Sequence, residues 1–185
     1  SRGRRALLLL AALFLGAAGG PGFSHLTMLY TSAGYDSLYI AALLSYLGAM
    51  ISLGKILCGQ VYDRLGSRGG DWFAFGSLLL SLVLCCLAPV GGALLPFLAI
   101  TAFGLGMSIT AVSPARWAAD LYGEQDYESG VRTITVFFTA GIFVFGPLPG
   151  ILADWLGSYV PSYAVFFALL LAAFLIVRGL YRKRA

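Results

Sequence analysis

Residues 59–68 read Gly-Gln-Val-Tyr-Asp-Arg-Leu-Gly-Ser-Arg, and this stretch decides the fold. It lies between two long apolar runs and holds three of the chain's few charged side chains, Asp63, Arg64 and Arg68. Its two glycines permit a close approach of helices and a tight reversal of the chain. A short polar segment between apolar runs predicts a hairpin that joins two membrane helices.

The composition indicates a membrane protein. Hydrophobic residues make up 59% of the 185 residues, and Asp, Glu, Lys and Arg together only 11%. Charges this sparse cannot cover the surface of a water-soluble fold, so apolar surface must face lipid. The apolar runs are too long and too uniform for the strands of a barrel. The predicted fold class is therefore an all-α membrane protein.

Six apolar runs are each near the ~20 residues that a helix needs to cross the hydrocarbon core. They form one predicted domain, residues 1–185, with spans at about 6–31, 37–60, 71–88, 93–117, 131–156 and 161–180. If these helices alternate in direction, all twelve Lys and Arg residues fall toward one side of the membrane. By the positive-inside rule that side is cytoplasmic. We therefore expect a multi-pass protein of the plasma or inner membrane with both termini in the cytoplasm.

The pattern of residues 59–67 returns at residues 150–158, at the end of the fifth predicted span. Gly, Asp, Leu, Gly and Ser match at a constant offset of 91 residues, from Gly59 to Gly150. The two copies occupy equivalent points of two three-helix units but lie on opposite membrane faces. This arrangement is typical of an inverted 3+3 repeat.

The hairpin pattern inside six predicted spans resembles the signature loop of the major facilitator superfamily of secondary transporters. The resemblance covers essentially the whole chain and is to the C-terminal six helices of that fold. In the family this loop acts as a conformational latch that docks against a helix of the other half. The matching residues here are Gly59, Asp63, Arg64, Gly66 and Arg68. A generic basic cytoplasmic turn is the alternative interpretation.

The resemblance implies secondary active transport by alternating access, with the substrate bound between two six-helix halves. The implied partners are a small anionic substrate, the lipid bilayer and a missing N-terminal half or a second copy. Nucleic acid, cofactors and metals are not implied. The sequence has no nucleophile–base set, phosphate-binding glycine loop or zinc spacing, so we do not expect an enzyme. A half-size transporter acting as a homodimer and a non-transporting sensor or assembly subunit remain as alternatives.

Within the superfamily, residues 25–30 and Gly54-Lys55 are similar to the oxalate/formate antiporter and monocarboxylate transporter branch. In that branch a cationic residue at the position of Lys55 binds the substrate carboxylate. Oxalate-type members carry a second cation after a Thr-Ala pair in the fifth span, where residues 139–141 here read Thr-Ala-Gly. This departure favours a monoanion over a dicarboxylate.

Lys55 and Ser52 are candidate substrate-binding residues on the second predicted span. They belong to a helical stripe of small or polar residues with spacings of three and four, Ala41, Ser45, Gly48, Ser52, Lys55 and Gly59. Such a stripe faces other helices or a cavity, where an ammonium attracts a small anion more strongly than in water. The alternative is that the Lys55 side chain extends to the interface and binds nothing.

The first span contains a candidate gate and the only histidine. Its middle predicts a helix break, tolerated only against protein or a water-filled cavity, at Gly19, Gly20, Pro21 and Gly22. A simple structural kink is the alternative. His25 either shuttles protons near neutral pH or is a packing residue with satisfied hydrogen bonds.

On the fifth span, Thr139 and Thr135 are further candidates. Either their hydroxyl groups line the same cavity, or they bond back to carbonyl groups of their own helix.

Overall fold

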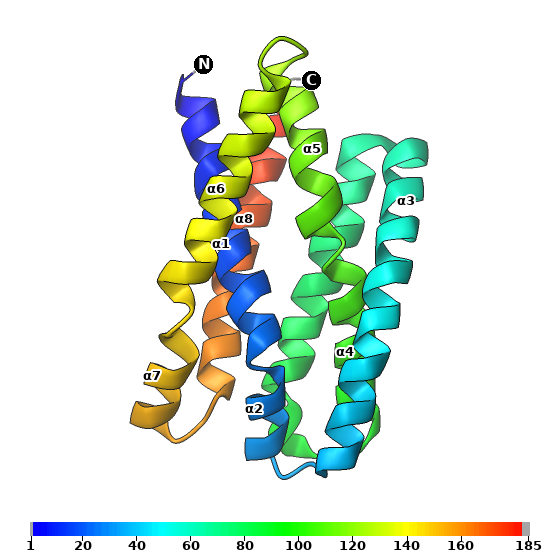
Figure 1. Ribbon diagram of the computed structural model, residues 1–185, viewed down its shortest axis with the longest axis vertical. Coiled ribbons are helices and arrows are strands. Elements are labelled where there is room, and N and C mark those ends of the chain that lie inside the picture. Colours follow the sequence, from blue (N-terminus) through cyan, green and yellow to red (C-terminus); the bar gives the residue numbers. More distant parts are fainter. Residues whose placement is uncertain (1, 183–185) are drawn as a thin grey trace.

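The computed structural model describes residues 2–182, and the elements in this range are helices, with no strand. They are α1 (Arg2–Ser24), α2 (Leu26–Ser32), α3 (Ser37–Cys86), the 3-10 helix η1 (Ala88–Val90), α4 (Leu94–Gly106), α5 (Ile109–Tyr122), α6 (Tyr127–Phe145), α7 (Leu148–Leu156) and α8 (Val160–Arg182). Figure 1 shows the long helices along one axis, with the start of α1 and the end of α8 at the same end of the bundle. Lys183 and Arg184, from the expected basic ending, lie outside the described residues.

Five helical stretches in the described range are long and apolar enough to cross a membrane. They are Arg2–Ser24, Ser37–Cys86, Leu94–Tyr122, Tyr127–Leu156 and Val160–Arg182. The structure is thus consistent with an all-α membrane protein. The six-span inverted repeat stays a prediction.

The 50 residues of α3 form two arms that meet at Gly66. Gly66 has φ 67° and ψ −173°, a combination open essentially only to glycine. Figure 1 shows the two arms antiparallel, with their turn at the end of the bundle that holds the termini. The expected hairpin is present but shorter than predicted, because residues before and after Gly66 keep helical geometry. Helical geometry thus continues past residue 60 and begins before residue 71, and the expected limits of the membrane spans there stay predictions.

The first expected span is α1 followed by α2, and the predicted position of its break is wrong. Gly19, Gly20, Pro21 and Gly22 all lie inside α1, and the interruption falls at His25, with φ −102° and ψ 7°. The physical reason is packing. A Cβ atom at Gly20 would lie 2.6 Å from Ile142 of α6, so this glycine allows a close helix approach.

The bundle is held by close helix crossings at glycines. A Cβ atom at Gly16 of α1 would lie 1.9 Å from the carbonyl oxygen of Phe138, and one at Gly141 of α6 would lie 2.0 Å from that of Leu13. In membranes small residues at such crossings let backbones approach and gain van der Waals contact. Because α1 and α6 meet this closely, side chains of both helices reach a common cavity.

Candidate functional site

Four of the predicted site residues, Gly19, Gly20, Thr135 and Thr139, line one cavity of about 340 Å³. It lies between α1, α6 and the junction of α4 with α5. Its full lining is Gly19, Gly20, Phe23, Met107, Thr110, Pro114, Thr135, Phe138, Thr139 and Ile142. We call it the threonine cavity. The structure brings these residues of α1 and α6 together in one cavity. Their role in binding a substrate stays a prediction.

The hydroxyl groups of this cavity differ in their bonding. Thr135 Oγ1 donates to the carbonyl of Val131 at 2.9 Å, and Thr110 Oγ1 donates to that of Met107 at 2.8 Å. Both therefore bond back to their own helical segment. Thr139 is exposed and has no hydrogen bond from its side chain within residues 2–182. The lining residues include no charged side chain, so the cavity offers a hydroxyl group and apolar surface.

Pro21 and Gly22 do not line the threonine cavity. Both are buried, and the carbonyl of Gly22 accepts a hydrogen bond of 2.8 Å from the hydroxyl of Tyr163 on α8. A Cβ atom at Gly22 would make ordinary contact with Phe103. These two residues of the predicted gate thus contribute to packing.

Lys55 and Ser52 lie on the first arm of α3, are both exposed and do not line the threonine cavity. Ser52 Oγ donates to the carbonyl of Gly48 at 3.1 Å. A Cβ atom at Gly48 or Gly59 would meet no atom within 4 Å. From Ala41 to Lys55 the residues of the predicted stripe are exposed and point away from the rest of this chain, whereas Gly59 faces a cavity shared with α5.

His25 is half-buried at the junction of α1 and α2. Its Nδ1 atom lies 3.0 Å from Ser24 Oγ and 3.0 Å from the carbonyl oxygen of Pro21, and its ring lies 6.3 Å from that of Tyr159. These contacts agree with the packing interpretation. The proton-shuttle role stays a prediction.

The latch residues lie at the tip of α3. Gly59 and Asp63 line a cavity of about 290 Å³ that also includes Arg116 of α5. Arg116 donates to the carbonyl of Tyr62 at 3.3 Å, and this cation stabilises the C-terminal end of the arm because helix carbonyls carry partial negative charge there. Within the described range, Asp63 and Arg64 are exposed and form no ion pair.

A buried polar network behind the hairpin was missed by the sequence analysis. Asp71 is only 4% exposed, and its Oδ1 atom accepts hydrogen bonds from the hydroxyl of Tyr62 and, at 3.0 Å, from Trp117 Nε1. The Tyr62 hydroxyl also lies 2.7 Å from Ser113 Oγ. An ionisable residue at the start of an apolar run was the available signal. The position of Asp71 at the edge of a predicted span hides this signal, because charged residues are ordinary at span ends.

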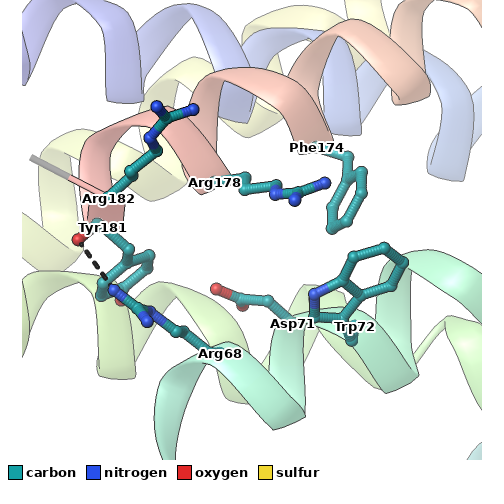
Figure 2. Close-up of a pocket in the computed structure, with 7 residues that line it drawn as sticks. All are labelled: Arg68, Asp71, Trp72, Phe174, Arg178, Tyr181 and Arg182. Carbon is teal, nitrogen blue, oxygen red and sulfur yellow. Dashed lines mark hydrogen bonds between the residues drawn. The ribbon is translucent and has the colours of Figure 1, made fainter.

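A second acidic residue joins the hairpin to two other helices. Asp120 of α5 accepts hydrogen bonds from Ser67 of the hairpin and, at 2.8 Å, from the hydroxyl of Tyr181 of α8. Arg68, the last latch residue, donates to the carbonyl of Tyr181 at 3.5 Å (Figure 2). Hydrogen bonds within this chain thus hold the turn at Gly66 against α5 and α8.

No protein-family model matches the chain. It is 28% identical over 180 residues to the protein described as uncharacterized MFS-type transporter YhhS, both of Salmonella enteritidis PT4 and of Salmonella typhimurium LT2. The match covers 94% of this chain but 42% of each relative, so the chain spans less than half the length of the curated relatives it matches. The chain is thus similar to part of proteins that are described as MFS-type transporters. This similarity and the apolar helices agree with the resemblance to the major facilitator superfamily.

Proposed function

We propose that the chain forms one six-helix unit of a secondary active transporter, related to the C-terminal half of the major facilitator fold. The unit moves a small organic anion of the monocarboxylate type by alternating access. The similarity to MFS-type transporters supports membrane transport of a small molecule. The anion and the alternating mechanism rest on the residues described next.

The single observation that carries the anion proposal is the exposure of Lys55 on an apolar helix, in a row with small and hydroxyl residues. An ammonium group that faces lipid within a membrane span is costly, so protein or water must cover it. Gly48 and Gly59 leave open space along the same row. A second six-helix unit facing this row would enclose a cavity in which Lys55 binds a carboxylate.

The threonine cavity contributes the neutral part of the binding site in this proposal. Thr139 has an available hydroxyl group, and Gly19 and Gly20 keep the α1 wall free of side chains. Apolar side chains such as Phe23 and Ile142 suit the carbon skeleton of an organic acid. Gating at α1 would then act at the His25 interruption, which separates α1 from α2.

The 59–68 hairpin is the proposed conformational latch. Asp63 and Arg64 are exposed at its tip and have no ion pair within the described residues. Charged groups in this position are free to dock on a facing unit. The facing unit is either a separate N-terminal half or a second copy of this chain, and the exposed row suits both.

Uptake of labelled formate and lactate tests the proposal, with the complete reading frame that encodes this chain expressed in uptake-deficient cells. Lys55→Ala should lower uptake by about tenfold at limiting substrate, because one charge-assisted contact is lost. Lys55→Arg, which keeps the cation, is the matched control and should retain most of the uptake. Unchanged uptake in Lys55→Ala at an equal amount of protein in the membrane would reject the role of Lys55.

Transport assays with the purified chain alone in liposomes distinguish a homodimer of this chain from a half-transporter that needs a separate N-terminal half. Counterflow of labelled formate by the purified chain would favour the homodimer. Transport that needs an additional six-helix unit would favour the half-transporter. Lack of transport in both settings, and for oxalate as well, would favour a non-transporting membrane subunit.

A further inference from the structure

A separate cavity of about 280 Å³ lies between the start of the second arm of α3 and the end of α8. It is lined by Arg68, Asp71, Trp72, Phe174, Arg178, Tyr181 and Arg182, and Figure 2 shows these side chains. We call it the arginine cavity. It shares no residue with the threonine cavity and lies at the end of the bundle that holds the hairpin turn and both ends of the described chain (Figure 1).

The arginine cavity has more cations than anions. Within residues 2–182, no carboxylate lies within 4.0 Å of the guanidinium groups of Arg68, Arg178 or Arg182. Arg178 lies over the ring of Trp72 at 5.5 Å from its centroid. Guanidinium groups bind the oxygen atoms of phosphate groups in forked geometry. The lining therefore suits a phosphate group.

Asp71 adds a requirement for a hydrogen-bond donor. Its Oδ1 atom is satisfied by Tyr62 and Trp117, but its Oδ2 atom is buried and has no hydrogen-bond partner within the described residues. Figure 2 shows the carboxylate in the space between Arg68 and Arg178. An occupant of this cavity must thus present anionic oxygen atoms to the arginines and a donor to Asp71.

The outer wall of the arginine cavity is apolar. Trp72, which lines the cavity, is 54% exposed. In a chain that spans a membrane such side chains contact acyl chains, and tryptophan prefers the interface with the headgroups. The cavity therefore combines a phosphate-binding end with a lipid-facing side.

We propose that the arginine cavity binds the headgroup of an anionic phospholipid with hydroxyl groups, of the phosphatidylglycerol type. Its phosphate binds Arg68 and Arg178, and a headgroup hydroxyl donates to Asp71 Oδ2. Its acyl chains follow the exposed ring of Trp72. Basic pockets between membrane helices bind anionic headgroups in this way.

Native mass spectrometry of the purified chain in detergent, with equal amounts of dioleoyl phosphatidylglycerol and dioleoyl phosphatidylcholine, tests this proposal. The chain should retain phosphatidylglycerol in preference. Arg68→Gln and Arg178→Gln should each weaken that binding about tenfold, the effect of losing one charge-assisted contact. Arg132→Gln, which removes the same charge from the exposed start of α6, should leave the binding unchanged.

Equal retention of the two lipids by the unaltered chain would overturn the proposal without the use of any variant. The proposal would also be overturned if Arg132→Gln weakened lipid binding as much as the cavity variants do. The lipid would then be held by the overall positive charge of the chain and not by this cavity. Millimolar inorganic phosphate in the sample distinguishes the source of the phosphate. Phosphatidylglycerol retained in its presence supports the lipid site, and binding of inorganic phosphate to a chain that retains no phosphatidylglycerol overturns it.

Discussion

Asp71 is the acidic residue of the buried polar network behind the hairpin. Its carboxylate joins Tyr62 at the end of the first arm of α3 to Trp117 of α5. Hydrogen bonds to a buried charged group count for more than those between neutral groups, because an unpaired charge in the interior is costly. The hydrogen bond from the Tyr62 hydroxyl to Asp71 should therefore contribute measurably to the free energy of unfolding.

Tyr62→Phe removes a donor to Asp71 and should cost about 1–3 kcal/mol of stability. Thermal unfolding in detergent, followed by circular dichroism, measures the loss. The matched control is Tyr46→Phe on the same arm, whose hydroxyl lies 3.1 Å from the neutral Thr101 Oγ1. This control should cost about 0.5–1.5 kcal/mol. An equal effect of both substitutions would show that the charge of Asp71 does not contribute.

At the scale of elements, the reversal within α3 depends on one backbone conformation. Gly66 adopts φ 67° with ψ −173°, and a Cβ atom there would meet no other atom within 4 Å. The requirement for glycine is therefore conformational and not due to crowding.

Gly66→Ala should destabilise the chain by roughly 1–3 kcal/mol, the usual cost of a side chain in this backbone region. Gly76→Ala is the control, because Gly76 lies in the helical part of the second arm with open space around it. There alanine should be neutral or stabilising by up to about 1 kcal/mol, since glycine is a poor helix former. Relative to the unaltered chain, the unfolding temperature of Gly66→Ala should thus fall, and that of Gly76→Ala should stay the same or rise. A loss at Gly76 equal to that at Gly66 would contradict the conformational explanation.

At the scale of the whole molecule, the ends of the helices fall into two groups. The start of α1, the turn at Gly66, the connection between α5 and α6 and the end of α8 lie at one end of the bundle in Figure 1, and α2 and α7 lie at the other. Arg5 of α1 and Asp126, just before α6, form an ion pair of 2.7 Å at the first of these ends. An alternating six-span topology requires this grouping.

Cysteine labelling with an impermeant maleimide in oriented vesicles tests this topology. Cysteines introduced at Arg64 and Glu124 should react from one side of the membrane, and those at Gly92 and Ser158 from the other. The unaltered chain is the control, because Cys58 and Cys85 are buried and Cys86 is half-buried. Reaction of Arg64→Cys and Ser158→Cys from the same side would contradict the six-span prediction.

The sequence by itself determined the membrane class, the helical content and the hairpin at residues 59–68. Hydropathy and the need for glycine in a tight turn are properties of short stretches, so they can be read locally. The same local pattern misplaced the break in α1. Pro21 and the glycines around it indicate a break, but close packing on α6 keeps them helical and the interruption falls at His25.

Only the tertiary structure decided which residues meet. It brought Gly20 and Thr139 together in the threonine cavity, placed Lys55 on a different surface and gave Asp71 its partners Tyr62 and Trp117. These contacts join helices that are far apart in the sequence, and they depend on side-chain volumes at the crossings. Local composition and spacing do not specify the distances between these residues, because the crossing geometry exists only once the helices are packed.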